Sequence, residues 1–287
     1  MRILVTGLCG FTGGYVQTEL QAHGHDVHGL SSDLTDPAAV SAEIANINPE
    51  AVLHLAAIAF VGHGNANSFY DVNLVGTRNL LEAISQNAPN IGSVMLTSSA
   101  NIYGNSVAGV LSETTPADPA NDYAVSKFAM EQMAHLWFDR LPLFIVRPFN
   151  YTGVGQDKNF LIPKIISHFQ SRSKTIELGN LEVWREFGDV RTVASIYRRL
   201  IEKNPLGKTL NICTGKAYSL GEVIALCETI TGHTIKIQVN PEFVRPNEVR
   251  ELTGDNSILK GFIGDWQSYD LEETLAWMLQ ECTFSNE

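Results

Sequence analysis

The chain has 287 residues, of which 44% are hydrophobic and 18% are charged. This composition is typical of a globular protein and excludes a disordered chain. The net charge is −11, with 31 acidic against 20 basic residues and no run of Lys or Arg, so we expect no nucleic-acid partner.

Two further classes of protein are disfavoured by patterns along the chain. No apolar run is long enough to cross a bilayer, and the first residues lack the apolar stretch of a signal peptide, so we expect no membrane partner and a cytoplasmic location. The four cysteines are scattered, and the eight histidines form no H-E-x-x-H pattern. We therefore expect neither a disulfide framework nor a metal site.

The first expected element is a buried strand over residues 2–6, followed by a glycine turn and a helix to about His23. This order directs free backbone N–H groups and the positive end of the helix dipole at one point, which suits a pyrophosphate. The turn is predicted to bind a dinucleotide, with a glycine-rich turn that holds no ligand as the alternative. The residues expected at the cofactor here are Gly7, Gly10, Phe11, Thr12 and Gly13. The glycines would form the tight turn, admit the phosphates and let the helix pack on the strand.

A second strand is expected over residues 26–30, and Ser31, Asp33 and Leu34 after it are expected to contact the cofactor. In a dinucleotide fold this position meets the adenosine ribose, where an acidic residue favours NAD and a basic one accommodates NADP. The serines supply neither charge, so the choice between NAD(H) and NADP(H) stays open. Asp33 is predicted at the adenine, but an Asx-turn or a helix cap would explain Asp33 and Asp36 equally well.

The next strand, expected over residues 51–57, ends in Leu55, Ala56 and Ala57, small enough for a cofactor to lie across them. A long amphipathic helix is expected over residues 67–88. Asn73 in this helix either faces solvent or turns its amide inward to join neighbouring strands.

A strand over residues 93–99 then ends in hydroxyl side chains at the carboxyl edge of the sheet, where open α/β sheets bind ligands. Tyr123 and Lys127 are four residues apart, so they lie on one face of a helix that ends near Phe138. An ammonium beside a phenol lowers the phenol pKa, so the tyrosine can act as an acid or base nearer neutral pH. Such a pair is more often a surface contact, but Ser99 at the end of the preceding strand favours the catalytic interpretation.

These motifs together resemble the extended short-chain dehydrogenase/reductases, in the sugar-nucleotide epimerase/dehydratase branch. The resemblance rests on the three glycines, His54-Leu55-Ala56-Ala57, Asn73, Ser99 and Tyr123-x-x-x-Lys127. It implies an α/β fold with a doubly wound parallel Rossmann sheet, a smaller, discontinuous α/β substrate domain and a homodimer. The cofactor domain would comprise residues 1–149 and 185–213, and the substrate domain residues 150–184 and 214–287.

The same resemblance implies a role for each catalytic candidate. Ser99 and Tyr123 would hydrogen-bond a sugar oxygen, and Tyr123 would move the proton. Lys127 would hold the nicotinamide ribose and lower the tyrosine pKa. Asn73 and Pro148 would complete the cofactor site.

The second half of the chain resembles the GDP-mannose 4,6-dehydratase group and the reductases that follow it. The segments that carry the resemblance are Arg147-Pro148-Phe149-Asn150, Gly179-Asn180-Leu181 with Arg185 and Phe187, and Arg245-Pro246-Asn247-Glu248-Val249. It implies that Asn150 contacts the substrate and that Arg185 and Arg245 bind its diphosphate, a role suited to planar cations. Glu248 either accepts from a sugar hydroxyl or pairs with a neighbouring arginine.

Asn101 distinguishes dehydration from reduction. The dehydratases of this group carry a glutamate there, and an amide cannot transfer the proton that dehydration requires. With Asn101 instead at the substrate, the chain is similar to the GDP-4-keto-6-deoxy-D-mannose reductases, which form GDP-D-rhamnose. We expect hydride transfer from NAD(P)H to C4 of a nucleotide-diphosphate 4-keto-6-deoxyhexose. A sugar-nucleotide 4-epimerase with retained NAD and a non-catalytic NAD(P)-binding sensor are the alternatives.

Overall fold

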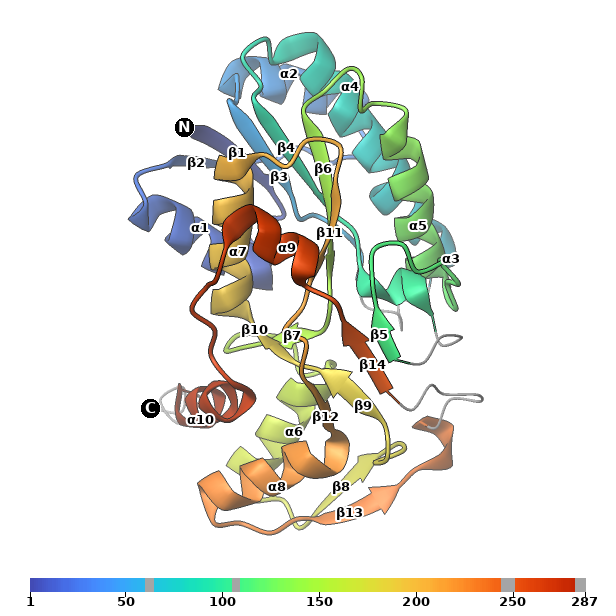
Figure 1. Ribbon diagram of the computed structural model, residues 1–287, viewed down its shortest axis with the longest axis vertical. Coiled ribbons are helices and arrows are strands. Elements are labelled where there is room, and N and C mark those ends of the chain that lie inside the picture. The colour runs from blue at the N-terminus through green and yellow to red at the C-terminus, as the bar shows by residue number, and fades with distance from the viewer. Residues whose placement is uncertain (60–64, 105–108, 244–250, 282–287) are drawn as a thin grey trace.

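The computed structural model describes residues 1–59, 65–104, 109–243 and 251–281. A six-stranded parallel sheet with helices on both faces forms its larger part, and short strands with three helices form a smaller part beside it (Figure 1). This confirms the predicted α/β fold. Within these residues, no helix is long and apolar enough to cross a membrane.

The strands of the large sheet lie in the order β11-β6-β4-β3-β1-β2, all paired in parallel. Their bounds are β1 (Arg2–Thr6), β2 (Asp26–Gly29), β3 (Ala51–His54), β4 (Ser93–Thr97), β6 (Leu143–Pro148) and β11 (Thr209–Ile212). The strand order reverses at β1, because β2 lies on one side of it and β3 on the other. Open α/β sheets bind ligands outside the carboxyl ends of the strands at such a point.

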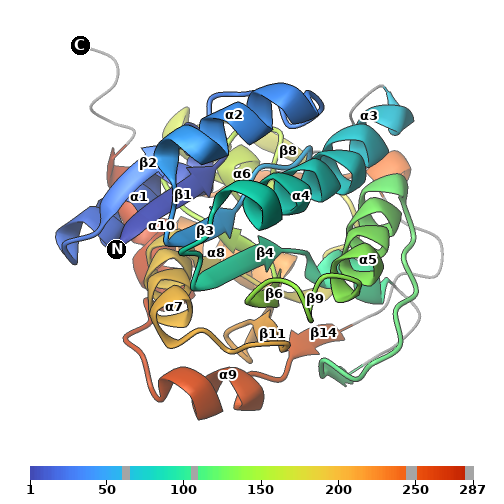
Figure 2. The same cartoon turned by 90° about the horizontal axis from the view of Figure 1, so that it is seen from above.

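The apolar strands divide their side chains between two buried clusters. Ile3 and Val5 face one cluster and Leu4 the other, so each strand is covered on both faces and reads as an unbroken apolar run. Figure 2 shows the sheet between the two helix layers. One layer holds α1 (Phe11–Ala22), α7 (Val190–Lys203) and α9 (Ser257–Ile263), and the other holds α2 (Pro37–Ile47), α4 (Thr77–Asn87) and α5 (Asp122–His135).

The helix predicted over residues 67–88 forms in three consecutive pieces. These are α3 (Ala66–Tyr70), a π-helical segment over Asp71–Gly76, and α4. A Cβ atom on Gly76 would lie 2.8 Å from Cβ of Leu34, so a glycine there lets the helix approach the chain that follows β2. π-helical segments are frequent at functional sites, and this one carries the buried Asn73.

The smaller part contains a four-stranded sheet in the order β12-β9-β14-β5 and the strand pairs β10-β7 and β13-β8. The strands are β5 (Gly109–Leu111), β7 (Tyr151–Thr152), β8 (Thr175–Leu178), β9 (Trp184–Glu186), β10 (Gly188–Asp189), β12 (Ala217–Ser219), β13 (Lys236–Val239) and β14 (Glu251–Gly254). The helices are α6 (Leu161–Gln170), α8 (Leu220–Thr231) and α10 (Leu271–Glu281), with 3₁₀ turns over Ala100–Tyr103 and Pro241–Phe243. The three helices share one apolar cluster, with Ile165, Val223 and Leu275 at its centre.

Elements cross the predicted domain boundaries in both directions. Strand β5, from the range 1–149, pairs with β14 of the smaller part, and strand β10, from the range 185–213, pairs there with β7. Helix α9, from the range 214–287, packs on α7 and β11 through Leu259 and Ile263. The division into two domains stays a proposal, with these elements exchanged across it.

Candidate active site

Ser99, Tyr123 and Lys127 lie together at the carboxyl edge of the large sheet. Ser99 follows β4 by two residues, and the other two lie one turn apart in α5. All three are buried, with 8%, 8% and 3% of their surface exposed. The Ser99 hydroxyl lies beside the Tyr123 phenol and lowers its pKa, and Nζ of Lys127 donates to the carbonyl oxygen of Thr97 over 2.8 Å. The structure thus brings the three predicted side chains to one place.

The pKa of Tyr123 differs from the sequence prediction. Burial raises it to about 12, and the neighbouring Ser99 opposes the shift only in part. Burial lowers the pKa of Lys127 to about 8, against the charge of Glu131 one turn further along α5. The expected lowering of the tyrosine pKa by Lys127 is therefore wrong for the protein alone: burial sets the direction of the shift, and Lys127 is not among its causes. Tyr123 keeps its proton at neutral pH and can donate it to an oxygen that gains negative charge.

The first turn of α5 is held from two sides. Asn121 caps it by accepting a hydrogen bond from the Ala124 amide over 2.9 Å. The hydroxyl of Tyr70 in α3 donates to Asp122 over 2.7 Å, and the Phe69 ring meets the Tyr123 ring nearly edge-on at 6.2 Å. The phenol therefore sits on a fixed helix end.

Asn73 turns its amide inward, as one of the two predicted alternatives has it. Oδ1 accepts from the Ile58 amide over 2.9 Å, and Nδ2 donates to the Ile58 carbonyl oxygen and to Oγ of Ser126. Ser126 in turn donates to the carbonyl oxygen of Tyr123 over 2.8 Å. Asn73 therefore joins the chain after β3 to the helical turn that carries Tyr123 and Lys127.

The glycine turn has the form that a pyrophosphate requires. Gly7 has a φ of 72°, and a Cβ atom there would lie 2.9 Å from the amide nitrogen of Ala56. A Cβ atom on Gly13 would lie 2.3 Å from the carbonyl oxygen of Gly7. The residue before helix α1 is Gly10, which has no side chain to cap the amides of the first turn. The residues present therefore fit a dinucleotide, whose phosphates would take these amides.

Phe11 and Thr12 both contact Tyr151, which is not among the residues predicted at the site. Oγ1 of Thr12 hydrogen-bonds the Tyr151 hydroxyl over 2.8 Å, and the Phe11 ring stacks on the Tyr151 ring at 6.3 Å. This links the glycine turn to the chain that leaves β6. A polar aromatic residue directly after a buried strand was the only sequence signal for it.

The residues after β2 have several roles. Asp33 accepts from the amide and hydroxyl of Thr35, and Asp36 caps α2, so the turn and cap alternatives account for both carboxylates. Leu34 is buried, and its carbonyl oxygen accepts from Asn79 of α4. Ser31 is exposed at the edge of the sheet.

The segment Leu55–Ala57 follows the end of β3 and borders the glycine turn, where the Ala56 amide donates to Oγ1 of Thr6 over 3.1 Å. His54, the last residue of β3, is fully buried and hydrogen-bonds Thr6 and Thr77 over 2.7 and 2.8 Å. Burial and the charge of Lys127 lower the His54 pKa to about 3. Its ring is therefore neutral and joins β1, β3 and α4.

The predicted substrate residues lie around the same edge. Asn101 donates its backbone amide to Oγ of Ser99 over 3.1 Å and exposes its side chain. Pro148 ends β6, and Asn150 is exposed two residues later. Arg185 is half-buried in β9. Arg245 and Glu248 lie outside the described residues.

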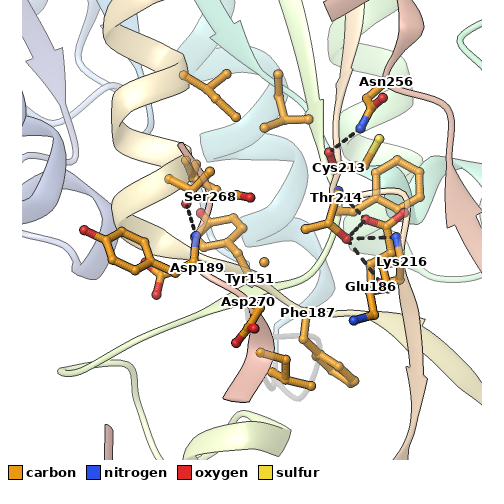
Figure 3. A pocket seen from close by; sticks show the side chains of 18 of the residues that line it. Tyr151, Glu186, Phe187, Asp189, Cys213, Thr214, Lys216, Asn256, Ser268 and Asp270 are labelled. Carbon is orange, nitrogen blue, oxygen red and sulfur yellow. Dashed lines mark hydrogen bonds between the residues drawn. The ribbon is translucent and has the colours of Figure 1, made fainter. Parts of the chain in front are cut away.

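A cavity of about 310 Å³ lies next to this site, between α7, the end of β11 and the chain that leads to α10. It touches Asn150 and Tyr151, but Ser99, Tyr123 and Lys127 are not among the described residues that line it. Figure 3 shows Glu186, Thr214 and Lys216 on one side of it and Ser268 with Asp270 on the other. The Glu186 carboxylate accepts from backbone amides and from the Thr214 hydroxyl, so it is satisfied within the protein. The predicted catalytic side chains therefore lie outside this cavity, at the sheet edge that carries Tyr123.

Comparison with known proteins identifies the family. The model of the NAD dependent epimerase/dehydratase family matches residues 3–213. The chain belongs to this family. The predicted membership of the extended short-chain dehydrogenase/reductases is thereby confirmed, and with it the prediction of an NAD(P)-dependent enzyme.

Two curated relatives act on GDP-linked 6-deoxy sugars. The GDP-6-deoxy-D-talose 4-dehydrogenase of Aggregatibacter actinomycetemcomitans is 39% identical over 272 residues, 92% of each chain. The GDP-6-deoxy-D-mannose reductase of Pseudomonas aeruginosa PAO1 is 29% identical and aligns with 98% of this chain and 96% of its own.

Solved structures share the whole fold. A crystal structure of a Burkholderia cenocepacia J2315 protein is 48% identical, with a TM-score of 0.93 and coverage of 98% of this chain and 97% of that one. RMD from Pseudomonas aeruginosa in complex with NADPH is 28% identical (TM-score 0.88, 98% and 99% covered). MoeE5 in complex with UDP-glucose and NAD is 27% identical (TM-score 0.88, 99% of both covered). These neighbours therefore include one complex with NADPH and one with NAD. The sequence left the choice between the two cofactors open.

Proposed function

We propose that the protein reduces the C4 carbonyl of a nucleotide-diphosphate 4-keto-6-deoxyhexose with NAD(P)H. The observation that carries this proposal is the pairing of the buried Ser99 hydroxyl with the Tyr123 phenol at the sheet edge, where the glycine turn also lies. A carbonyl oxygen that accepts hydrogen bonds from both groups is polarised for hydride attack at its carbon.

The nicotinamide, when bound, supplies the hydride. Ser99 polarises the carbonyl, and Tyr123 protonates O4: the phenolic O–H bond breaks, the O4–H bond forms, and solvent later returns a proton to the phenolate. Lys127, one turn along α5, stabilises that phenolate with its ammonium group. Because burial raises the Tyr123 pKa to about 12, the phenol starts in the protonated state that reduction requires.

We propose GDP as the nucleotide and GDP-6-deoxy-D-talose as the product. The proposal of GDP rests on two relatives, which are named for GDP-6-deoxy-D-talose and for GDP-6-deoxy-D-mannose. These two sugars differ only in configuration at C4. Hydride delivery to opposite faces of one ketone gives these two epimers. The higher identity of the talose enzyme favours the talose product over the GDP-D-rhamnose expected from the sequence alone.

The test is turnover of GDP-4-keto-6-deoxy-D-mannose with NADH or NADPH, followed by proton NMR of the product for the configuration at C4. We expect stoichiometric consumption of reduced nicotinamide. Epimerisation of a GDP-sugar without net consumption would favour the 4-epimerase alternative and overturn the proposal.

The Tyr123→Phe variant tests the role of the phenol. We expect a loss of about 10²–10⁴-fold in kcat with unchanged binding of reduced nicotinamide. Tyr269→Phe is the matched control, since it also removes a phenolic oxygen, from a ring that packs on the Arg191 guanidinium at the start of α7. Activity of Tyr123→Phe close to that of the control would refute the assignment.

We also propose that the protein is a homodimer joined through α4 and α5. Leu74, Val75, Met133, Leu136 and Trp137 line a shallow groove between these helices. Val75 and Leu136 are 48% and 76% exposed. Arg78, Glu82 and Arg140 line the same groove, and exposed apolar side chains rimmed by polar ones are typical of an interaction site.

A further inference from the structure

Ser31 and Ser32 lie where the adenosine ribose of a dinucleotide is expected. They follow β2, whose last residue, Gly29, sits against the glycine turn: a Cβ atom there would lie 3.0 Å from Cδ2 of Leu8. The Leu30 amide still pairs with the carbonyl oxygen of Val5, so the two serines begin at the carboxyl edge of the sheet. This is the position that distinguishes NAD from NADP in dinucleotide folds.

A carboxylate from helix α2 occupies this position. Oε1 of Glu43 accepts from the amide and the hydroxyl of Ser31, both over 2.8 Å. Oε2 accepts from the amide of Ser32 over 2.8 Å and from its hydroxyl over 2.5 Å. These four hydrogen bonds lower the Glu43 pKa against the effect of partial burial, so the group is ionised at neutral pH. No local sequence pattern indicates this role of Glu43, because Glu43 lies in α2, twelve residues beyond Ser31.

The four bonds change what the serines can offer a ligand. A serine hydroxyl has one proton and two lone pairs, and both protons here are directed at Glu43. Two amides and two hydroxyls would otherwise form a set of four donors, suited to a phosphate. With Glu43 in place, the serine oxygens can accept from a ribose hydroxyl but have no proton left for a phosphate oxygen.

The surrounding sequence supplies no cation. Residues 3–77, which include the glycine turn, β2, α2 and β3, contain neither lysine nor arginine. A 2′-phosphate carries a charge of about −1.5 to −2 and would face the Glu43 carboxylate with no basic partner from these elements.

We propose that Glu43 makes the protein select NAD(H) over NADP(H). The inference rests on the proposed function, since it concerns the same cofactor site. The carboxylate acts in two ways: it takes the donor protons of Ser31 and Ser32, and it repels the 2′-phosphate. It does not contact the reacting atoms, so it is a specificity residue and not a catalytic one.

The unaltered chain tests this without activity. Fluorescence titration with NADH and with NADPH gives two dissociation constants, and we expect NADH to bind at least about tenfold more tightly. Adenosine 5′-monophosphate and adenosine 2′,5′-bisphosphate, which differ only in the 2′-phosphate, should compete with NADH in the same order. Equal binding, or tighter binding of NADPH, would overturn the inference and leave the proposed reaction intact. Failure of both nucleotides to bind would overturn both.

Two variants of Glu43 distinguish a role in cofactor selection from a role in supporting the loop. Glu43→Ala frees four donors and removes the charge, so NADPH affinity should rise about tenfold while NADH affinity changes by less than about threefold. Glu43→Gln should shift the ratio of the NADPH and NADH affinities in the same direction but by less, because its amide oxygen can still accept a hydrogen bond from one serine. Glu50→Gln is the matched control. Glu50 directly precedes β3, at the amino ends of the strands, and accepts a hydrogen bond from the Arg2 amide. If Glu43→Ala weakens both nucleotides equally, Glu43 only supports the loop and the inference is wrong.

Discussion

Glu131 of α5 and Arg147 of β6 form a bidentate ion pair, with Nε and Nη2 of the arginine 2.9 and 2.7 Å from the two carboxylate oxygens. Nη1 of Arg147 also donates to the Tyr103 hydroxyl over 2.9 Å, which in turn donates to Asn211 of β11. Both members of the pair are buried, and Glu131 lies one turn of α5 beyond Lys127. The charge of Glu131 partly restores the Lys127 pKa that burial lowers.

Removing one member of this pair should destabilise the fold strongly. Glu131→Leu leaves a buried guanidinium without its carboxylate, so we expect the free energy of unfolding to fall by about 3–5 kcal/mol in urea titration. Glu131→Leu with Arg147→Met should recover part of this loss, since both charges are then gone. Asp26→Asn breaks the exposed pair with His28 and should cost no more than about 1 kcal/mol. Equal losses from the buried and the exposed pair would contradict this account.

Acid should weaken the fold through His54. The folded protein holds the His54 pKa at about 3, from a usual value of 6.5, because the ring is buried near Lys127. Between these values the unfolded chain binds a proton that the folded chain does not, so stability falls as pH falls through this range. The loss of unfolding free energy that His54 causes reaches up to about 5 kcal/mol at the acid end of this pH range.

Free energies of unfolding, measured between pH 4 and pH 7 for the original chain and for the His54→Gln variant, check this prediction. The glutamine can bond to Thr6 and Thr77 but does not titrate, so its slope against pH should be smaller. Parallel curves for the two proteins would show that other groups cause the acid sensitivity.

Local patterns account for most of the fold and for the three proposed catalytic side chains. The apolar runs of the large sheet are recognisable because each strand is buried on both faces. Tyr123 and Lys127 are recognisable because helical spacing alone puts them on one face. The predicted cap at Asp36 needs only neighbours within three residues.

What the sequence could not reveal depends on contacts between distant elements. Glu43 meets Ser31 only because α2 folds back over the end of β2, and Glu131 meets Arg147 only across α5 and β6. An arginine inside the apolar run Leu143–Pro148 did indicate a buried partner, but not which one. The direction of the Tyr123 pKa was missed for a related reason: neighbouring charges are visible in a sequence, whereas desolvation depends on the packed structure.

Asn73 should affect catalysis through position alone. Asn73→Ala leaves the amide and carbonyl of Ile58 without their side-chain partner, so we expect about 1–3 kcal/mol less stability. The turn of α5 should also loosen, and kcat should fall more than KM changes. Asn67→Ala, which alters an exposed residue of α3, is the control. A change confined to KM would instead place Asn73 in substrate binding.

The proposed dimer predicts a specific response to charge in the groove between α4 and α5. Leu136→Glu should produce monomers, because it removes the exposed apolar side chain of Leu136 from the interface and puts there a carboxylate that loses its hydration on association. Leu206→Glu is the control, since Leu206 is similarly exposed, at 56%, but lies in the loop after α7. Sedimentation equilibrium at several concentrations distinguishes the outcomes: the original chain and Leu206→Glu should sediment as dimers and Leu136→Glu as a monomer. If all three sediment alike, the α4–α5 face is not the interface, and the apolar groove there needs another occupant.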